Sequence, residues 1–277
     1  MRLLAFALAL ALPAGGGAAA AQSPGQPERA VVWAVGDAAT PNDAARRLAA
    51  HIRAAEPDRF LYLGDVYEQG TARDFRRHYH PLYGALAPIT DPTPGNHEWA
   101  NRFSGYYPYW RARKGRRQPP WSSTTIAGWE ILALNSLADH TRGSRQLRWL
   151  RRALAKPEGD CRIAFWHRPR FTAGLYEDAP DLAPLWSALR GEAKAVLSGH
   201  DHNLQRLRPR NGITQYVAGA GGATPYAVDE TDPRLLWGEG GRFGALRIVL
   251  EPGRAEFEFR DAGGRLLDRS RQACSPG

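Results

Sequence analysis

At residues 30–37 the chain reads AVVWAVGD, a short apolar run that ends at a glycine followed by an aspartate. A run of this length without polar interruptions is typical of a strand buried on both faces. The same pattern returns at residues 59–65 and 89–96, where Asp65 and Asn96 each follow a glycine. Because ligands gather at the carboxyl ends of strands in layered α/β folds, these polar ends predict an α/β architecture with a site at one sheet edge.

Helices are predicted between the strands, mainly from capping residues. Thr40 can cap a helix whose first position is Pro41, and this helix is expected to run to about Ala55. Further helices are predicted at residues 71–79, 144–154 and 182–190, and further strands at 129–134, 162–166, 193–197, 214–218, 245–250 and 255–259. No repeat or internal linker interrupts the pattern, so residues 30–277 are predicted to form one domain.

The first 21 residues have the features of a signal peptide. Arg2 is followed by an apolar run of about ten residues, Leu3 to Leu12, and then by small residues up to Ala21. The alternative is an uncleaved membrane anchor, but the strongly apolar run is shorter than the roughly 20 residues that a spanning helix needs. We therefore expect an exported protein, periplasmic or secreted, without a stable membrane anchor, in which residues 22–29 are a linker.

The overall charge is strongly positive, at +9 with a pI of about 9.9. A basic surface attracts anionic substrates, and it permits nucleic-acid binding without favouring it. The densest basic cluster, at residues 111–117, lies in a Gly/Pro-rich stretch and is predicted to be a loop, either simply solvated or forming a phosphate-attracting rim. A hydrophobic fraction of 43% and a charged fraction of 23% exclude a wholly disordered chain.

The chain contains two cysteines, Cys161 and Cys274. In an exported protein these can form a disulfide that ties the C-terminal tail to the core. The alternative is a pair of free thiols.

Metal-binding residue types follow the strands at several positions. The motifs, in chain order, are Gly36-Asp37, Gly64-Asp65 with Tyr67, Gly95-Asn96-His97-Glu98, His167-Arg168-Pro169 and Gly199-His200-Asp201-His202. This mixture of carboxylate, imidazole and amide suits Zn, Fe or Mn better than Ca or Mg, and the absence of thiolates argues against a structural cysteine site. Each motif alone is weak evidence, but the set in this order is specific.

These motifs resemble those of the calcineurin-like metallophosphoesterases, in the branch related to purple acid phosphatases. The resemblance extends from about residue 30 to the C-terminus. It implies a four-layer fold, a central β-sandwich flanked by helices, with a dinuclear metal centre at one sheet edge. The metal pair is expected to be drawn from Fe, Zn and Mn, and its identity stays open.

The resemblance also implies a role for each motif residue. Asp37 and His202 would bind the first metal, and Asp65 would bridge the two ions. The second metal would be bound by Asn96, His167 and His200. His97 would face the substrate without binding metal, so that it and Asp65 are the expected catalytic residues.

The chain departs from the family pattern at two positions. Most of the superfamily has a histidine where this chain has Ala39. The purple acid phosphatase branch uses a tyrosine three residues after the bridging aspartate, whereas Tyr67 lies two residues after Asp65. Tyr67 is therefore either a ligand of the first metal or a packing aromatic beside the site.

The function implied by the resemblance is hydrolysis of small phosphate monoesters by a metal-bridging hydroxide, with His97 as general acid. One alternative is a phosphodiesterase or nuclease acting on nucleotides. Another is a degenerate, non-catalytic metal-binding relative. Arg168 would either contact the phosphate or lie at the surface. Glu98, Asp201 and Asn203 would either orient the imidazoles or face solvent.

Overall fold

The computed structural model describes residues 27–40, 42–155 and 161–275. The predicted signal peptide and most of the predicted linker lie outside the described residues, as does Pro41. None of the helices in the described part of the chain has the length and apolarity needed to cross a bilayer.

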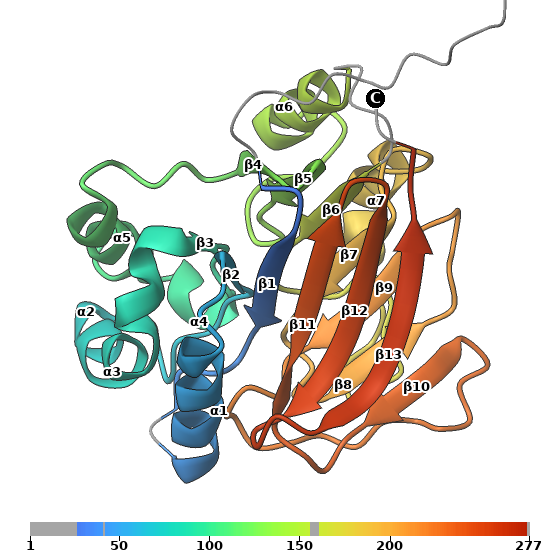
Figure 1. The fold of residues 1–277 in the computed structure, drawn as a ribbon. Helices are drawn as coiled ribbons and strands as arrows, with labels where there is room; N and C mark the ends of the chain where they lie inside the picture. Colours follow the sequence, from blue (N-terminus) through green and yellow to red (C-terminus); the bar gives the residue numbers. More distant parts are fainter. Residues whose placement is uncertain (1–26, 41, 156–160, 276–277) are drawn as a thin grey trace, which may run out of the picture.

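Two β-sheets form the centre of the molecule (Figure 1). The first sheet has the strand order β13 (Leu266–Ala273), β12 (Arg254–Asp261), β11 (Gly244–Glu251), β1 (Ala30–Val35), β2 (Arg59–Tyr62) and β3 (Thr90–Pro92). The second has the order β10 (Leu235–Glu239), β8 (Leu204–Leu207), β9 (Thr214–Ala218), β7 (Ala195–Ser198), β6 (Arg162–Phe165), β5 (Trp129–Ala133) and β4 (Ser122–Ile126). Strands β1, β2 and β3 run parallel, as do β5, β6, β7 and β9.

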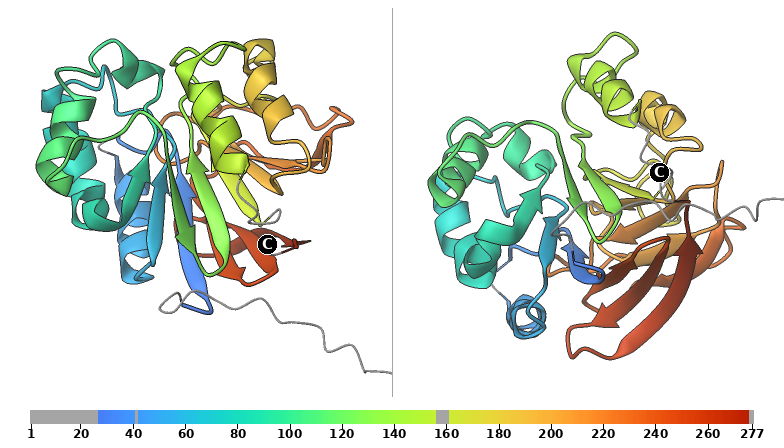
Figure 2. Two further views of the ribbon diagram at one scale, coloured as in Figure 1. Left: turned by 90° about the horizontal axis from the view of Figure 1, so that it is seen from above. Right: turned by 45° about the horizontal axis from the view of Figure 1, so that its top comes forward.

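Helices cover the outer side of the second sheet and the outer side of β1, β2 and β3 in the first sheet, whereas no helix of the described chain lies over the outer face of β12 and β13 (Figure 2). Beside the first sheet lie α1 (Asp43–Ala54), α2 (Ala72–Asp74), a π-helical turn (Phe75–Tyr79), α3 (His80–Tyr83), a 3₁₀ turn (Gly84–Ile89), α4 (Asn96–Trp99) and α5 (Tyr106–Lys114). Beside the second lie α6 (Arg145–Leu154), a 3₁₀ turn (Pro180–Leu182) and α7 (Ala183–Ala188). The predicted mixed α/β class, with two central sheets and helices outside them, is confirmed.

The alternation of side chains along β1 shows why these layers form. Val32 and Ala34 lie in the core between the two sheets, whereas Trp33 and Val35 pack under α1. Because both faces of the strand are buried, the sequence at 30–35 is continuously apolar. A third cluster, which includes Leu147 of α6, covers the far side of the second sheet.

The structure corrects two local predictions. Thr40 does not cap α1, because the side chain of Asn42 accepts the hydrogen bond from the Ala45 amide at 2.8 Å. The basic cluster is not wholly a loop, because α5 extends to Lys114 and ends at Gly115, whose φ of 65° is left-handed. The predicted caps Thr71 and Ser144 are confirmed.

Four strands escaped prediction: β4, β8, β10 and β13. Three of them, β4, β10 and β13, are edge strands with partly exposed side chains. An edge strand with both faces partly solvated lacks the apolar run by which the buried strands were found.

Cys161 and Cys274 form a disulfide, with Cα atoms 5.0 Å apart. Cys161 immediately precedes β6 of the second sheet, and Cys274 immediately follows β13 of the first. The bond therefore ties the edge of one sheet to the centre of the other.

Candidate metal centre

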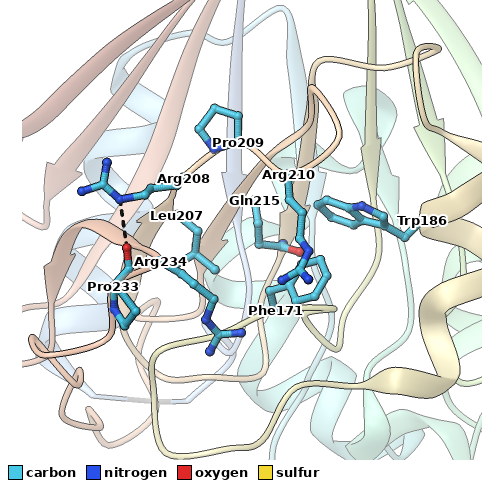
Figure 3. Close-up of a pocket in the computed structure, with 9 residues that line it drawn as sticks. All are labelled: Phe171, Trp186, Leu207, Arg208, Pro209, Arg210, Gln215, Pro233 and Arg234. Carbon is cyan, nitrogen blue, oxygen red and sulfur yellow. Dashed lines mark hydrogen bonds between the residues drawn. The ribbon is translucent and has the colours of Figure 1, made fainter.

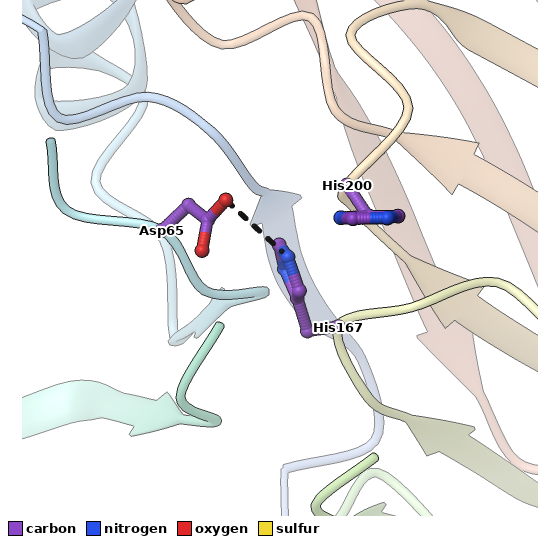
Figure 4. A group of neighbouring side chains, drawn as sticks. All are labelled: Asp65, His167 and His200. Atoms are coloured by element: carbon purple, nitrogen blue, oxygen red, sulfur yellow. Dashed lines mark ion pairs between the residues drawn. The ribbon is translucent and has the colours of Figure 1, made fainter. Parts of the chain in front are cut away.

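The predicted ligands meet at the edge where the parallel strands of both sheets end. Suitable donor atoms of Asp65, His167 and His200 all lie within 4.8 Å of one another (Figure 4). Asn96 Oδ1 lies 2.9 Å from His167 Nε2, so the amide joins the same group. These residues come from the loops after β2, β3, β6 and β7.

A second group of donors adjoins the first. Asp37 Oδ1 lies 3.5 Å from His202 Nε2. The phenol oxygen of Tyr67 lies between them, 3.0 Å from the Asp37 oxygen and 2.8 Å from the His202 nitrogen. It is also 3.5 Å from Oδ2 of Asp65, whose own distance to His167 Nε2 is 3.4 Å. Asp65 Oδ2 thus lies between the two groups.

The backbone at these strand ends is held in an uncommon conformation. Asp37, Asp65 and His200 have φ values of 57°, 66° and 70°, in the left-handed region. Such residues cost about 1–3 kcal/mol each and cluster at functional sites. Gly95 is also required, because a Cβ there would lie 2.0 Å from Asp65 Oδ1. The loops therefore turn sharply enough to point the carboxylates and the His200 ring at one place.

Hydrogen bonds from outside the cluster orient its side chains. His167 Nδ1 pairs with the Leu63 carbonyl at 2.8 Å, and His202 Nδ1 pairs with the Thr224 carbonyl at 2.9 Å. Both rings therefore present Nε2 to the cluster, as is usual for metal-binding histidines. One oxygen of Asp37 accepts from the His200 amide at 2.7 Å, which leaves its other oxygen for a cation.

Buried carboxylates support the loops from behind. Glu98 Oε2 accepts from the amides of Asp65 (3.1 Å) and Gly95 (3.2 Å). Burial, reinforced by the negative charge of Asp65, raises the pKa of Glu98 to about 8. Asp201 accepts from Thr172 Oγ1 and from the Leu175 amide. Both carboxylates are buried, so the prediction that they face solvent is wrong. Within the described chain they accept from backbone amides and a hydroxyl and not from an imidazole, so the prediction that they orient the histidines is wrong as well.

Two other residues named from the sequence lie beside the cluster. Asn203 is buried and accepts from Gln205 through Oδ1 at 2.8 Å. The guanidinium of Arg168 binds Asp181 at 2.9 Å, and its positive charge contributes, after burial and the charge of His167, to lowering the pKa of His200.

The buried carboxylates of the cluster need a positive charge beside them. Asp37 and Asp65 are almost wholly buried. Burial raises the pKa of Asp37. Burial acts to raise the pKa of Asp65 too, but the charge and hydrogen bond of His167 outweigh it and hold this pKa well below its ordinary value. Burial acts to lower the pKa of His167, but Asp65 raises it to about 9. A metal ion between these atoms would replace the His167 proton as the balancing positive charge.

The pKa of His200 is lowered to about 3, by burial and then by the charge of His167. Its ring is therefore neutral near pH 7, the form that binds metal. Oxygen and nitrogen donors in two adjoining groups that share Asp65 fit a pair of transition-metal ions.

A family model described as calcineurin-like phosphoesterase matches residues 30–204. The chain belongs to the calcineurin-like phosphoesterase family. Tartrate-resistant acid phosphatase type 5 of Oryctolagus cuniculus is 37% identical over 139 residues, which are 46% of this chain and 42% of that protein. The matched segment thus spans less than half of this relative's length. The resemblance stated from the sequence motifs is confirmed.

Solved structures agree on the fold of this calcineurin-like phosphoesterase. A purple acid phosphatase from Lupinus luteus seeds aligns with a TM-score of 0.73 at 17% identity, over 91% of this chain and 55% of that one. GAP50, the anchor in the inner membrane complex of Plasmodium, aligns with a TM-score of 0.72 at 13% identity, over 89% of each chain. At these identities the likeness concerns the fold alone. Membership of the calcineurin-like phosphoesterase family implies a dinuclear metal centre.

The metal-centre pocket is a hollow of about 260 Å³ directly over the cluster. Besides cluster residues it is lined by Thr40, Glu68, His97, Thr224 and two aromatic residues, Tyr176 and Tyr226. Thr40, Glu68, Ala223, Thr224 and both of these tyrosines were not predicted to lie at the site. No local pattern marks them, because loops far apart in the chain bring them here.

A separate pocket of about 210 Å³, the arginine pocket, lies against the helix-covered face of the second sheet (Figure 3). Phe171 and Trp186 form its apolar wall, with Arg208, Arg210 and Arg234 around it. None of the predicted site residues lines this pocket. The guanidinium of Arg234 is engaged by Asp178, Asp232 and the Thr172 carbonyl.

Proposed function

We propose that this protein is an exported, dinuclear-metal phosphatase that hydrolyses small phosphate monoesters. Phosphoesterase activity is expected from the family. The main support for two metals is that Asp65 Oδ2 lies near both the His167 group and the Tyr67 group of donors, beneath an open pocket. Export is proposed from the sequence of residues 1–21 alone, and N-terminal sequencing of the mature protein tests it.

Asp37, Tyr67 and His202 would hold one ion. Asn96, His167 and His200 would hold the other, with Asp65 between them. When bound, such a pair lowers the pKa of coordinated water and offsets charge on the phosphoryl oxygens. Fe, Zn and Mn all suit these donors, and elemental analysis of the purified protein decides among them.

His97 would hold the proton that the leaving oxygen needs. Its Nδ1 pairs with the Glu68 carbonyl, and its amide donates to Asp65 Oδ1 at 3.0 Å. The ring lines the pocket with Nε2 3.7 Å from Asp65 Oδ2, beside the cluster rather than within it. A general acid in such a position contributes roughly 10²–10⁴-fold to the rate.

The non-catalytic alternative rested on Ala39 and on the spacing of Tyr67. Ala39 is buried and forms a β-bridge with Val66, so the chain has no ligand at that position. The phenol oxygen of Tyr67 stands among the donors of Asp37 and His202 instead. This orientation supports a complete first metal site.

The central test is Asp65→Asn in metal-loaded protein. Turnover of a generic aryl phosphate should be abolished, because an amide supplies neither the charge nor the second oxygen that bridges the two groups. Asp43→Asn is the matched control, since its side chain is 84% exposed on α1. An Asp65→Asn protein that keeps most of its activity would contradict the proposal.

A further inference from the structure

Two tyrosines form an aromatic wall over the histidines of the cluster. The ring of Tyr176 lies parallel to that of His200, with centroids 4.2 Å apart and planes at 20°. The ring of Tyr226 lies in the same way on His202, at 4.2 Å and 17°. The two tyrosine rings meet edge to face at 5.9 Å, and both line the metal-centre pocket. A phosphoryl group at the cluster therefore has aromatic surface directly beside it.

The wall is open to a ligand. Tyr176 is 39% exposed, although one face of its ring covers His200. Aromatic pairs gain from offset or edge-to-face contact beyond the area that they bury. A planar leaving group attached to the phosphoryl oxygen would find such contacts with Tyr176 and Tyr226.

No lysine or arginine stands in the described lining of the metal-centre pocket to bind a second anionic group of the substrate. The chain has 37 Lys and Arg residues, yet none of the described residues that line this pocket is one of them. Glu68 is exposed at the pocket, and within the described chain its carboxylate forms no ion pair. A second phosphate or a carboxylate on the substrate would therefore meet a like charge instead of the arginine or lysine that usually binds it.

From these two observations we infer that the metal-centre pocket selects phosphate monoesters whose leaving group is aromatic and carries no negative charge. The inference deepens the proposed phosphatase function and rests on it. The net positive charge of the protein then does not serve to bind the substrate, because no lysine or arginine stands in the described lining of this pocket. Nucleic acid and polyphosphates are then poor substrates.

The test compares three esters on the metal-loaded, full-length mature protein. Benzyl phosphate and cyclohexylmethyl phosphate both release a primary alcohol, so they differ mainly in the aromatic ring. 4-Carboxybenzyl phosphate adds one negative charge to the first. We expect kcat/KM for benzyl phosphate to exceed that for cyclohexylmethyl phosphate by about five- to tenfold. It should exceed that for 4-carboxybenzyl phosphate by about tenfold.

Three variants test whether Tyr176 and Glu68 cause the preference for an aromatic, uncharged leaving group. Tyr176→Leu should bring the ratio of benzyl to cyclohexylmethyl phosphate towards one. If Tyr176 merely held His200 in place, all three esters would slow equally and the ratio would not move. Glu68→Gln should raise kcat/KM for 4-carboxybenzyl phosphate relative to benzyl phosphate. Glu177→Gln, an exposed neighbour of Tyr176 that does not line the pocket, is the control and should leave both ratios unchanged.

The possible failures are distinct. Equal kcat/KM for benzyl and cyclohexylmethyl phosphate, or a preference for the carboxylated ester, overturns this inference and leaves the phosphatase function standing. A metal-loaded protein that hydrolyses none of the three esters overturns the proposed function, and this inference with it.

Discussion

The phenol oxygen of Tyr67 lies 3.0 Å from Oδ1 of Asp37, although the two residues follow different strands. The same oxygen is 2.8 Å from His202 Nε2. Tyr67 sits two residues after Asp65, whose φ of 66° is left-handed, and residues 67–69 form a turn. This turn brings the phenol into the group of donors that would hold the first metal.

Tyr67→Phe should therefore weaken one of two metal sites. We expect roughly a 10–100-fold loss of affinity for one ion per chain, the range found when a partner of a metal site is removed. Titration of metal-free protein with Zn²⁺, followed by elemental analysis, measures both affinity and stoichiometry. Tyr107→Phe, on α5, is the control. Unchanged affinity for both ions would show that the Tyr67 ring only packs beside the cluster.

The strand ends were predictable because their signal is local. An apolar run, a glycine and a polar residue follow one another at Asp37, Asp65 and Asn96. That they meet His200, 163 residues from Asp37, was expected only in general terms from the convergence of strand ends, and the resemblance supplied the role of each residue, because the approach depends on the pairing of whole strands. No spacing rule for a single segment contains that information.

The N-terminal cap of α1 also depends on a contact between residues far apart in the chain. Asn42 is the better cap by intrinsic preference, but the proline that follows Thr40 suited the first helical position and led to the prediction of Thr40. The side-chain amide of Asn42 also donates to the Gly222 carbonyl at 2.6 Å, from a residue 180 positions away. The choice of cap thus goes together with a tertiary contact. The stacking of Tyr176 on His200 and of Tyr226 on His202 depends on loop packing in the same way.

His97→Ala should slow turnover without releasing metal. We expect kcat to fall roughly 10²–10⁴-fold for an alkyl ester such as benzyl phosphate, whose leaving oxygen needs a proton. The loss should be smaller for 4-nitrophenyl phosphate, whose leaving group is stable as an anion. His140→Ala is the matched control, because His140 pairs with Asp181 and does not line the pocket. Loss of bound metal from His97→Ala would mean that this ring belongs to the metal site.

Removing the disulfide should destabilise the fold markedly. The bond joins residues 113 positions apart, and on the chain-entropy model a loop of that length is worth about 4–5 kcal/mol. Cys274→Ser should lower the free energy of unfolding by up to this amount, measured by urea titration. The Cys161→Ser/Cys274→Ser double variant should lose about as much as the better-tolerated single variant, because either change already breaks the bond. Equal stability of the oxidised and reduced wild-type protein would contradict this expectation.

Glu258 on β12 should make a pH-dependent contribution to stability. It lies directly opposite Arg247 on β11 and Arg269 on β13 in the strand register. Its carboxylate binds both guanidinium groups and that of Arg260, each at 2.8 Å, and is almost fully buried. Burial acts to raise the pKa of Glu258, but the three arginines together lower it from 4.5 to about 2.

Because this pKa is lower in the folded protein, the stabilisation is complete above pH 4.5 and is lost as the pH falls from 4.5 towards 2. Glu258→Gln should therefore cost about 1–3 kcal/mol at pH 7, because water partly screens the exposed arginines, and the difference from wild type should shrink steadily below pH 4.5. Urea unfolding at pH 7, 5 and 3 measures it. Glu256→Gln, two residues along the same strand, loses only partly exposed ion pairs with Arg269 and Arg271 and should change stability by about 0–1 kcal/mol. A constant difference between Glu258→Gln and wild type from pH 7 to 3 would show that the arginines do not hold Glu258 ionised.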